Sequence, residues 1–170
     1  MVAELSNLLS KTNDEFSRLR ILQTTDLHAH VLAFDYNNNR LFSRRGLSRT
    51  ALHIDEARAL PVPSLLFDSG DFLQGSPLAD RLAQDPQTAP SDHPVITAMN
   101  LTGYDAATLG NHDLDFGLAH LSAALSQARF PIVSANLRLP QEAAPQLKRF
   151  VILERNLEGH DTPLRLGVTG

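Results

Sequence analysis

Short apolar runs alternate along this chain with segments whose apolar residues recur at helical spacing. Compact apolar runs typical of buried strands occupy residues 19–23, 64–67, 105–109 and 131–135. Helical periodicity predicts helices over residues 46–60, 77–84, 95–103 and 118–128. Because strands and helices alternate in this way, the pattern predicts an α/β fold.

The rest of the chain gives weaker signals. Two further strands are expected at residues 149–153 and 164–169, and loops at 31–45 and 85–93. Residues 1–18 carry only a weak helical pattern and are interpreted as an amino-terminal extension, so that one domain spans residues 19–170. A chain of 170 residues is long enough for one domain with its own core.

Composition narrows the possible partners. Hydrophobic residues make up 42% of the chain and charged residues 20%, which is typical of a soluble globular protein. The net charge of −4 offers no general attraction to DNA or RNA, so no nucleic acid polymer is expected as a partner. The absence of cysteine excludes disulfides and thiolate metal sites. No membrane span or signal peptide is recognisable, so a cytoplasmic location is expected, or a periplasmic one if a leader has been removed.

Polar residues with metal-ligand chemistry follow three of the predicted strands. They form the segments Asp26-Leu27-His28, Asp68-Ser69-Gly70-Asp71 and Gly110-Asn111-His112-Asp113. The carboxyl ends of strands in an α/β sheet meet at one edge, where such loops bring their side chains together. Each segment alone is a weak signal, but three in succession predict one shared metal site.

Crowded carboxylates at the end of a buried sheet repel one another and favour a bound cation. The predicted ligands are Asp26, His28, Asp71 and Asn111, with Asp68 as a further candidate. Oxygen ligands combined with imidazole suit Mn, Fe, Co or Zn better than Mg. We expect two divalent metal ions, with Asp71, central in the chain order, as the bridging ligand.

A hydrolytic reaction fits this set of residues. Two divalent ions lower the pKa of a bound water from ~15.7 towards ~7 and hold the oxygens of a phosphoryl group, so that hydroxide is supplied at neutral pH. His112, next to Asn111, is the predicted general acid for the leaving oxygen, a role worth about 10²- to 10⁴-fold in rate. Asp115, three residues later, is expected to orient His112.

Other polar residues are assigned mostly structural roles. His30 is a secondary candidate for the site, and Gln74 with Gly75 is expected to shape the adjoining loop. Ordinary core-edge, turn or solvent positions are predicted for His53, His93, His120, His160 and Asn136, and Asn136 could equally support the site. Four arginines could reach a phosphate, but a solvated basic loop is the preferred interpretation; they are Arg40, Arg44, Arg45 and Arg49.

The three polar segments resemble the first three signature blocks of the calcineurin-like metallophosphoesterases. Longer stretches are similar to the 5′-nucleotidase branch of that family, and within it to the 2′,3′-cyclic-nucleotide 2′-phosphodiesterase/3′-nucleotidase type. These stretches are Thr24–His30, Asp71–Leu78, His93–Asn100 and Tyr104–Asp113. The resemblance runs from about Leu19 to Gly170 without a large break.

The resemblance implies a four-layer α/β/β/α catalytic domain, a β sandwich flanked by helices, of which this chain would hold only the first half. It also implies a dinuclear metal centre and a small nucleotide as substrate. Asp26 and His28 would bind the first metal ion, Asp71 would bridge the two, and Asn111 would bind the second.

Two departures from the family pattern change this expectation. By the same resemblance, His112 and Asp115 would form the catalytic pair. The first departure is Asp115 itself, because we expect Asn at this position in the cyclic-phosphodiesterase type, whereas Asp is usual in 5′-nucleotidases. The family's remaining ligands, a histidine and a His-x-His pair, have no counterpart in this chain. We therefore expect an amino-terminal part of the catalytic domain with weak or no activity of its own, and a noncatalytic metal- or nucleotide-binding module is the alternative.

Overall fold

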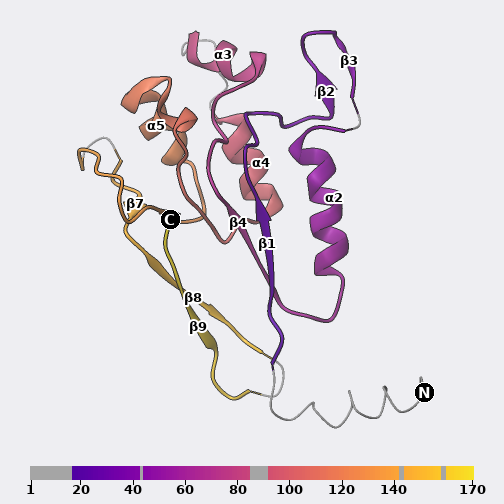
Figure 1. Ribbon diagram of the computed structural model, residues 1–170, viewed down its shortest axis with the longest axis vertical. Helices are drawn as coiled ribbons and strands as arrows, with labels where there is room; N and C mark the ends of the chain where they lie inside the picture. Colours follow the sequence, from indigo (N-terminus) through magenta and orange to yellow (C-terminus); the bar gives the residue numbers. More distant parts are fainter. Residues whose placement is uncertain (1–16, 43, 85–91, 142–143, 158–159) are drawn as a thin grey trace.

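The structure is a computed structural model that describes residues 17–42, 44–84, 92–141, 144–157 and 160–170 (Figure 1). Its helices are α2 (Leu47–Arg58), α3 (Pro77–Gln84), α4 (Pro94–Thr102) and α5 (Gly117–Leu125), with one 3-10 turn, η1 (His112–Leu114). The first strands are β1 (Arg20–Thr24), β2 (Phe34–Asp35), β3 (Arg40–Leu41), β4 (Ser64–Asp68) and β5 (Ala106–Ala107). The later strands are β6 (Ile132–Val133), β7 (Leu147–Lys148), β8 (Val151–Arg155) and β9 (Leu164–Val168).

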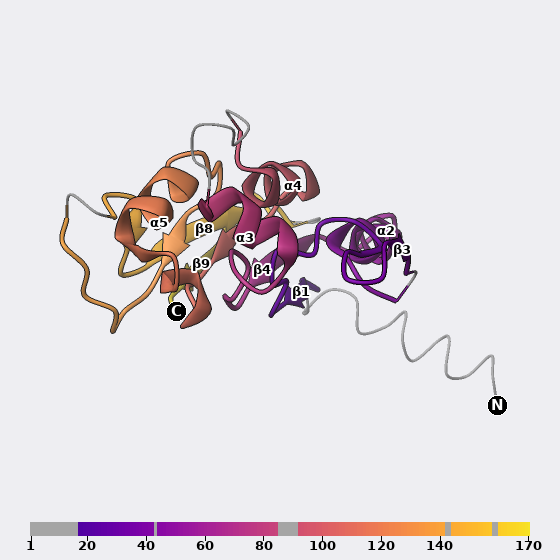
Figure 2. The same cartoon turned by 90° about the horizontal axis from the view of Figure 1, so that it is seen from above.

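The main sheet is parallel throughout, with the strand order β1-β4-β5-β6-β7. The strands therefore follow one another across the sheet in chain order, each pairing with the free edge of the strand before it. Because crossovers between parallel strands are right-handed, this order places the connecting helices on one face of the sheet. Seen from above, α5 and α2 lie at opposite ends of the structure, with α3 and α4 between them (Figure 2).

The hydrophobic core lies between the sheet and these helices. Leu66 of β4 and Ile132 of β6 pack in one cluster with helix residues such as Met99 and Leu121, all of them fully buried. Each such side chain contributes roughly 1.5–3 kcal/mol by leaving water. Phe72 belongs to the same cluster although it lies in the loop after β4. The core therefore anchors one of the polar loops directly.

Among the described residues, the antiparallel β8–β9 hairpin rather than a helix contacts the other face of the sheet. Arg155 at the end of β8 forms an ion pair with Asp105, just before β5. Val168 of β9 shares a small hollow with Phe67 of β4. Large apolar side chains remain exposed on β1 and at the hairpin, since Ile21 is 52% exposed and Phe150 is 62% exposed.

The structure confirms the predicted α/β architecture, and the four predicted helices lie within three residues of their predicted ends. The strands β5 and β6 are two residues long, shorter than predicted. After Ala107 the chain leaves the ladder for the site loop at residues 110–113. The strand predicted at residues 149–153 is present as β8, two residues later in the chain. β7, which was not predicted, precedes it and is the last strand of the parallel sheet. None of the described helices is long and apolar enough to cross a membrane.

The 31–45 segment is not only a loop, because β2 and β3 form a short hairpin within it. Its turn is stabilised by Asp35, whose carboxylate accepts hydrogen bonds from the backbone N–H groups of Asn37 and Asn38, each at 3.2 Å. Asn39 adopts the left-handed conformation, with φ of 48°. The weak helical pattern near residues 5–9, most of the extension and most of the 85–93 loop lie outside the described residues.

Two histidines pack as neutral rings where α4 and α5 meet. His93 precedes α4, is 9% exposed, and its ring centroid lies 5.5 Å from that of His120 on α5. Neither ring nitrogen of His93 has a hydrogen-bond partner among the described residues. Burial lowers the pKa of His93 to about 4, so the ring is uncharged at neutral pH. The structural role predicted for both histidines is therefore confirmed.

This burial predicts that acid destabilises the fold through His93. The unfolded chain binds the proton near the ordinary pKa of 6.5, whereas the folded chain binds it only near pH 4. The His93 contribution is therefore fully present above pH 6.5 and falls by about 3 kcal/mol between pH 7 and pH 4. Urea unfolding across this range should show that His93→Leu removes that part of the pH dependence, whereas His53→Leu, at an exposed position, leaves it unchanged. Parallel curves for the native chain and His93→Leu would contradict the prediction.

Candidate metal centre

Backbone hydrogen bonds extend the pairing of β1 and β4 into the loops that follow them. Asp26 N–H donates to Gly70 O at 3.1 Å, and His28 N–H donates to Asp71 O at 2.8 Å. These bonds hold the two loops side by side although Asp26, His28 and Asp71 all have left-handed φ values, of 54°, 47° and 61°. Such conformations cost of order 1–3 kcal/mol for residues other than glycine and persist where the surroundings enforce them.

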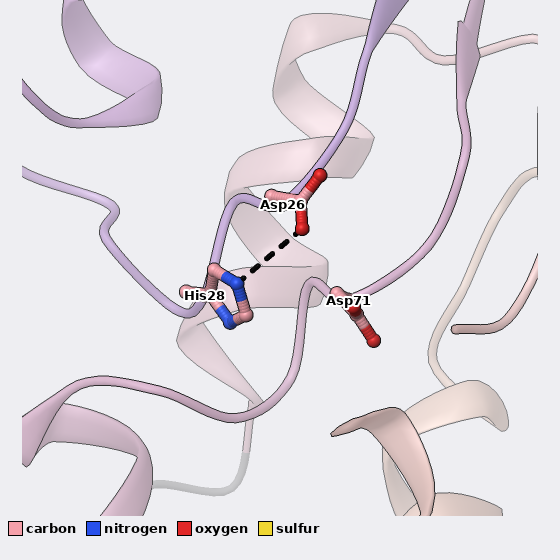
Figure 3. A group of neighbouring side chains, drawn as sticks. All are labelled: Asp26, His28 and Asp71. Atoms are coloured by element: carbon pink, nitrogen blue, oxygen red, sulfur yellow. Dashed lines mark ion pairs between the residues drawn. The ribbon is translucent and has the colours of Figure 1, made fainter. Parts of the chain in front are cut away.

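The paired loops bring three predicted ligands together. One oxygen of Asp26, one nitrogen of His28 and one oxygen of Asp71 all lie within 4.8 Å of one another. Figure 3 shows these side chains; the Asp26 carboxylate lies 3.5 Å from His28 Nε2. Two carboxylates and an imidazole in this arrangement fit a divalent ion such as Mn, Fe, Co or Zn.

The orientation of His28 suits a ligand role. Its Nδ1–H donates a hydrogen bond of 2.8 Å to the carbonyl oxygen of Gln74, which leaves the Nε2 lone pair free toward Asp26. Gly75 makes this contact possible, because a Cβ atom there would lie 2.6 Å from His28 Nδ1. Gln74 and Gly75 therefore shape the site, as predicted.

A buried carboxylate joins the second loop to the third. Asp113, 2% exposed, accepts hydrogen bonds from four backbone N–H groups. The donors are Asp71 (2.8 Å), Phe72 (2.9 Å), Leu73 (2.8 Å) and Gly110 (2.9 Å). Burial raises the pKa of Asp113, and the four donors oppose that rise by stabilising the charged form. Asp113 therefore fixes the loop that carries Asp71.

The loops that follow β4 and β5 are in close contact, which requires glycine in each of them. A Cβ atom on Gly70, whose φ is 99°, would lie 2.3 Å from Gly110 N, and one on Gly110 would lie 2.2 Å from Asp71 Oδ1. Such distances are far below van der Waals contact. Asp71 Oδ1 accepts the backbone N–H of His112 at 2.8 Å, so the third loop also positions the Asp71 carboxylate.

The two residues predicted to form a catalytic pair are in contact, and their catalytic role stays a prediction. His112 Nδ1 lies 2.7 Å from Asp115 Oδ2, and the His112 ring centroid lies 5.5 Å from that of His28. The Asp115 carboxylate raises the pKa of His112. A bond at Nδ1 leaves Nε2 of His112 available for a substrate atom.

Two other predicted residues are placed differently. Asn111 is exposed and directly precedes His112, so it lies beside the group, and its role as a ligand stays a prediction. Asp68 is not in the group; it is buried at the end of β4 and accepts hydrogen bonds from Thr24 Oγ1 at 2.5 Å and Gly70 N–H at 2.9 Å. Burial raises the pKa of Asp68 to about 6. Its role is therefore structural, since these bonds end the strand and turn the chain.

A cleft of about 670 Å³ opens beside the group. Asp26, His28 and His112 line it, together with His30 and Arg45. A cavity of this size is in the range that holds small-molecule ligands. Arg45 is exposed, as expected for a solvated basic loop, and it also lines this open cleft.

Sequence reasoning missed the parts played by Asp113 and Arg45. Asp113 lies in the predicted site segment 110–113, but nothing in the sequence distinguishes a buried supporting carboxylate from a metal ligand. Arg45 was one of several arginines in a polar stretch, and only the fold separates it from Arg49, which does not line the cleft. The signal that could have found it is its position directly before Gly46 at the start of a helix.

A family model described as calcineurin-like phosphoesterase matches residues 19–153, most of the chain and all three loops of the site. The chain belongs to the calcineurin-like phosphoesterase family. The family predicted from the sequence is thus confirmed. Members of this family use divalent metals, which agrees with the donor set of Asp26, His28 and Asp71.

Named members of this phosphoesterase family match the chain closely. It is 38% identical over 155 residues to the 2′,3′-cyclic-nucleotide 2′-phosphodiesterase/3′-nucleotidase of Yersinia enterocolitica, across 89% of this chain and 24% of that protein. It is 35% identical over 138 residues to the snake venom 5′-nucleotidase of Gloydius brevicauda, across 79% of this chain and 22% of that protein. The calcineurin-like phosphoesterase YfkN from Bacillus subtilis has a similar crystal structure, with a TM-score of 0.74 and 34% identity over 89% of this chain and 46% of that one. The chain thus spans about a quarter of the length of the Yersinia relative.

The contact between Gly75 and His28 predicts a specific loss of metal binding. In Gly75→Ala the new methyl group would displace the His28 ring from Gln74 O, and we expect about 10- to 100-fold weaker Mn²⁺ binding by calorimetry. Gly117→Ala is the matched control, because Gly117 also has a positive φ, of 81°, but its Cβ would meet no atom within 4 Å. Equal Mn²⁺ affinity in the two variants would contradict the role given to Gly75.

Proposed function

We propose that this phosphoesterase domain hydrolyses small nucleotides, as part of a 2′,3′-cyclic-nucleotide 2′-phosphodiesterase/3′-nucleotidase. The observation that carries the proposal is the grouping of Asp26, His28 and Asp71 within 4.8 Å, beside a cleft that is lined by Asp26, His28 and His112. The relative from Yersinia enterocolitica supports the substrate class by its name. Because the chain spans only 24% of that relative, the activity is assigned to the complete protein, and the chain alone is proposed to be weakly active or inactive.

The metal site is proposed to be dinuclear. Asp26 and His28 would hold one ion, Asp71 would bridge, and Asn111 would contribute to the second. Placement of Asn111 beside the backbone contact between His112 and Asp71 supports this assignment. The chemistry that such ions supply when bound is activation of water and neutralisation of phosphoryl oxygens.

The protein's own residues would orient the substrate and move one proton. Asp71 is held in place by the backbone N–H of His112, so its carboxylate has a fixed direction. His112, with Nδ1 bonded to Asp115, would present a protonated Nε2 to the leaving oxygen of the phosphoester. Asp115 raises the pKa of His112 and so favours the imidazolium form that this role requires.

A 5′-nucleotidase is the second candidate, and Asp115 favours it. The resemblance on which the substrate class rests leads us to expect Asn at this position in the cyclic-phosphodiesterase type. The 35% identity to the Gloydius brevicauda 5′-nucleotidase also supports this candidate. The two functions differ in which phosphoester of the nucleotide faces the metal site.

Activity assays on the complete protein test both candidates. With Mn²⁺ we expect hydrolysis of 2′,3′-cyclic AMP and 3′-AMP, and a kcat about 10²- to 10⁴-fold lower in His112→Ala because the general acid is lost. Turnover of 5′-AMP alone would favour the second candidate. Absence of turnover with bound Mn²⁺ would indicate a noncatalytic binding module, and an unaltered rate in His112→Ala would show that His112 is not the acid.

The pairing of His112 with Asp115 predicts the pH dependence of kcat. A general acid must be protonated, so activity is lost as the pH rises through the pKa of His112. Asp115 raises this pKa, and Asp115→Asn should therefore move the alkaline limb to lower pH. Glu56→Gln, which affects an exposed contact of His53, is the control and should leave the profile in place. An unchanged alkaline limb in Asp115→Asn would show that Asp115 does not raise the pKa of the catalytic acid.

A further inference from the structure

The cleft contains a positive charge that the proposed reaction does not use. Arg45 is the only arginine or lysine among the described residues that line the cleft. Its lining also holds Asp26, His28 and His112, where the scissile phosphate would lie under the proposed function. His30 also lines the cleft, and its Nε2 is 3.5 Å from Arg45 Nη1.

The chain around Arg45 is firmly held. Leu47 N–H donates to His30 O at 2.8 Å, which ties the start of α2 to the loop after β1. Gly46 has φ of 101°, and a Cβ atom on it would lie 2.3 Å from Leu32 O, so the backbone next to Arg45 packs directly against that loop. The Arg45 guanidinium lies 5.7 Å from the centre of the Phe42 ring, a cation–π contact that limits its freedom. Arg45 is therefore positioned for a ligand before one arrives.

The charge of Arg45 is not balanced by a carboxylate. None of the ion pairs formed among the described residues includes Arg45. Asp35, on the neighbouring hairpin, is engaged by the backbone of Asn37 and Asn38 and faces Arg40 at 3.9 Å. Asp26 faces His28 in the metal group. An anionic ligand is then the group that Arg45 can pair with in the cleft.

We propose that Arg45, with His30 beside it, binds a second anionic group of the substrate in this cleft. This inference rests on the proposed function, because the position of the first phosphate comes from it. Guanidinium groups bind phosphate through two parallel hydrogen bonds and are well suited to this task. The substrate class is a nucleotide with two separate phosphates on one ribose, such as a nucleoside 3′,5′-bisphosphate.

This class of ligand fits either candidate reaction. In a nucleoside 3′,5′-bisphosphate one phosphate can lie at the metal group while the other reaches Arg45, whichever of the two is hydrolysed. A nucleoside monophosphate would leave Arg45 without its partner. Arg45 is therefore assigned to substrate selection, and His112 and the metal ligands to the reaction.

Binding and hydrolysis measured in parallel test the subsite. Adenosine 3′,5′-bisphosphate, 3′-AMP and 5′-AMP are titrated into the complete protein with Mn²⁺, in a His112→Ala background that slows turnover. Arg45→Gln should weaken bisphosphate binding about 10- to 100-fold, the size expected for lost charge-assisted hydrogen bonds, and change monophosphate binding less than about twofold. Arg45→Lys, which keeps the charge, should retain part of the affinity. Arg49→Gln, on α2 but outside the cleft lining, is the matched control and should bind all three ligands normally.

The outcomes separate this inference from the proposed function. Equal losses for bisphosphate and monophosphates in Arg45→Gln, an equal loss in Arg49→Gln, or no binding of the bisphosphate would overturn the subsite. Release of inorganic phosphate from the three nucleotides by the protein with His112 intact is followed separately. If the protein hydrolyses nucleotides but Arg45→Gln shows no selective loss of bisphosphate affinity, the proposed function stands and the subsite is wrong. If Arg45→Gln selectively loses bisphosphate affinity but no nucleotide is hydrolysed, the subsite stands and the proposed function is wrong.

Discussion

Four backbone N–H groups from two separate loops converge on one buried carboxylate, that of Asp113. Three of the donors follow β4 and the fourth, Gly110, follows β5, so the carboxylate joins the ends of neighbouring strands. Leaving four such donors unpaired in the interior would cost ~1–3 kcal/mol each. Asp71 owes its place to this arrangement, because its own N–H is one of the four and its carboxylate meets His112 N–H from the other loop.

Burial divides the acidic residues of the site into two kinds. Asp68 and Asp113 are nearly inaccessible and bind backbone or hydroxyl groups, so they shape the loops. Asp26 and Asp115 are exposed and partly free of such bonds, and Asp71 is only half-buried, so these three can face a metal ion, an imidazole or a substrate. The same residue type thus serves as framework in the interior and as reactive group at the surface, a few ångströms away.

The sequence predicted the helices, the first strands and the grouping of Asp26, His28 and Asp71, because hydrophobic periodicity and the meeting of parallel strand ends are regular features. It did not show the short length of β5 or the presence of β7, which depend on pairing with strands distant in sequence. It also could not assign Asp68 and Asp113, since exposure is a property of the folded chain. Arg45 was hidden for the same reason, because its place at the cleft depends on the contact between Gly46 and Leu32.

Asp26, His28 and Asp71 are proposed to share a divalent ion. Anomalous diffraction from crystals of the protein soaked in Mn²⁺ tests it most directly, since the peak locates the ion without reference to activity. We expect a strong peak bonded to an oxygen of Asp26, Nε2 of His28 and an oxygen of Asp71. A map with no peak at these three side chains, or with Mn²⁺ bound only elsewhere, would contradict it.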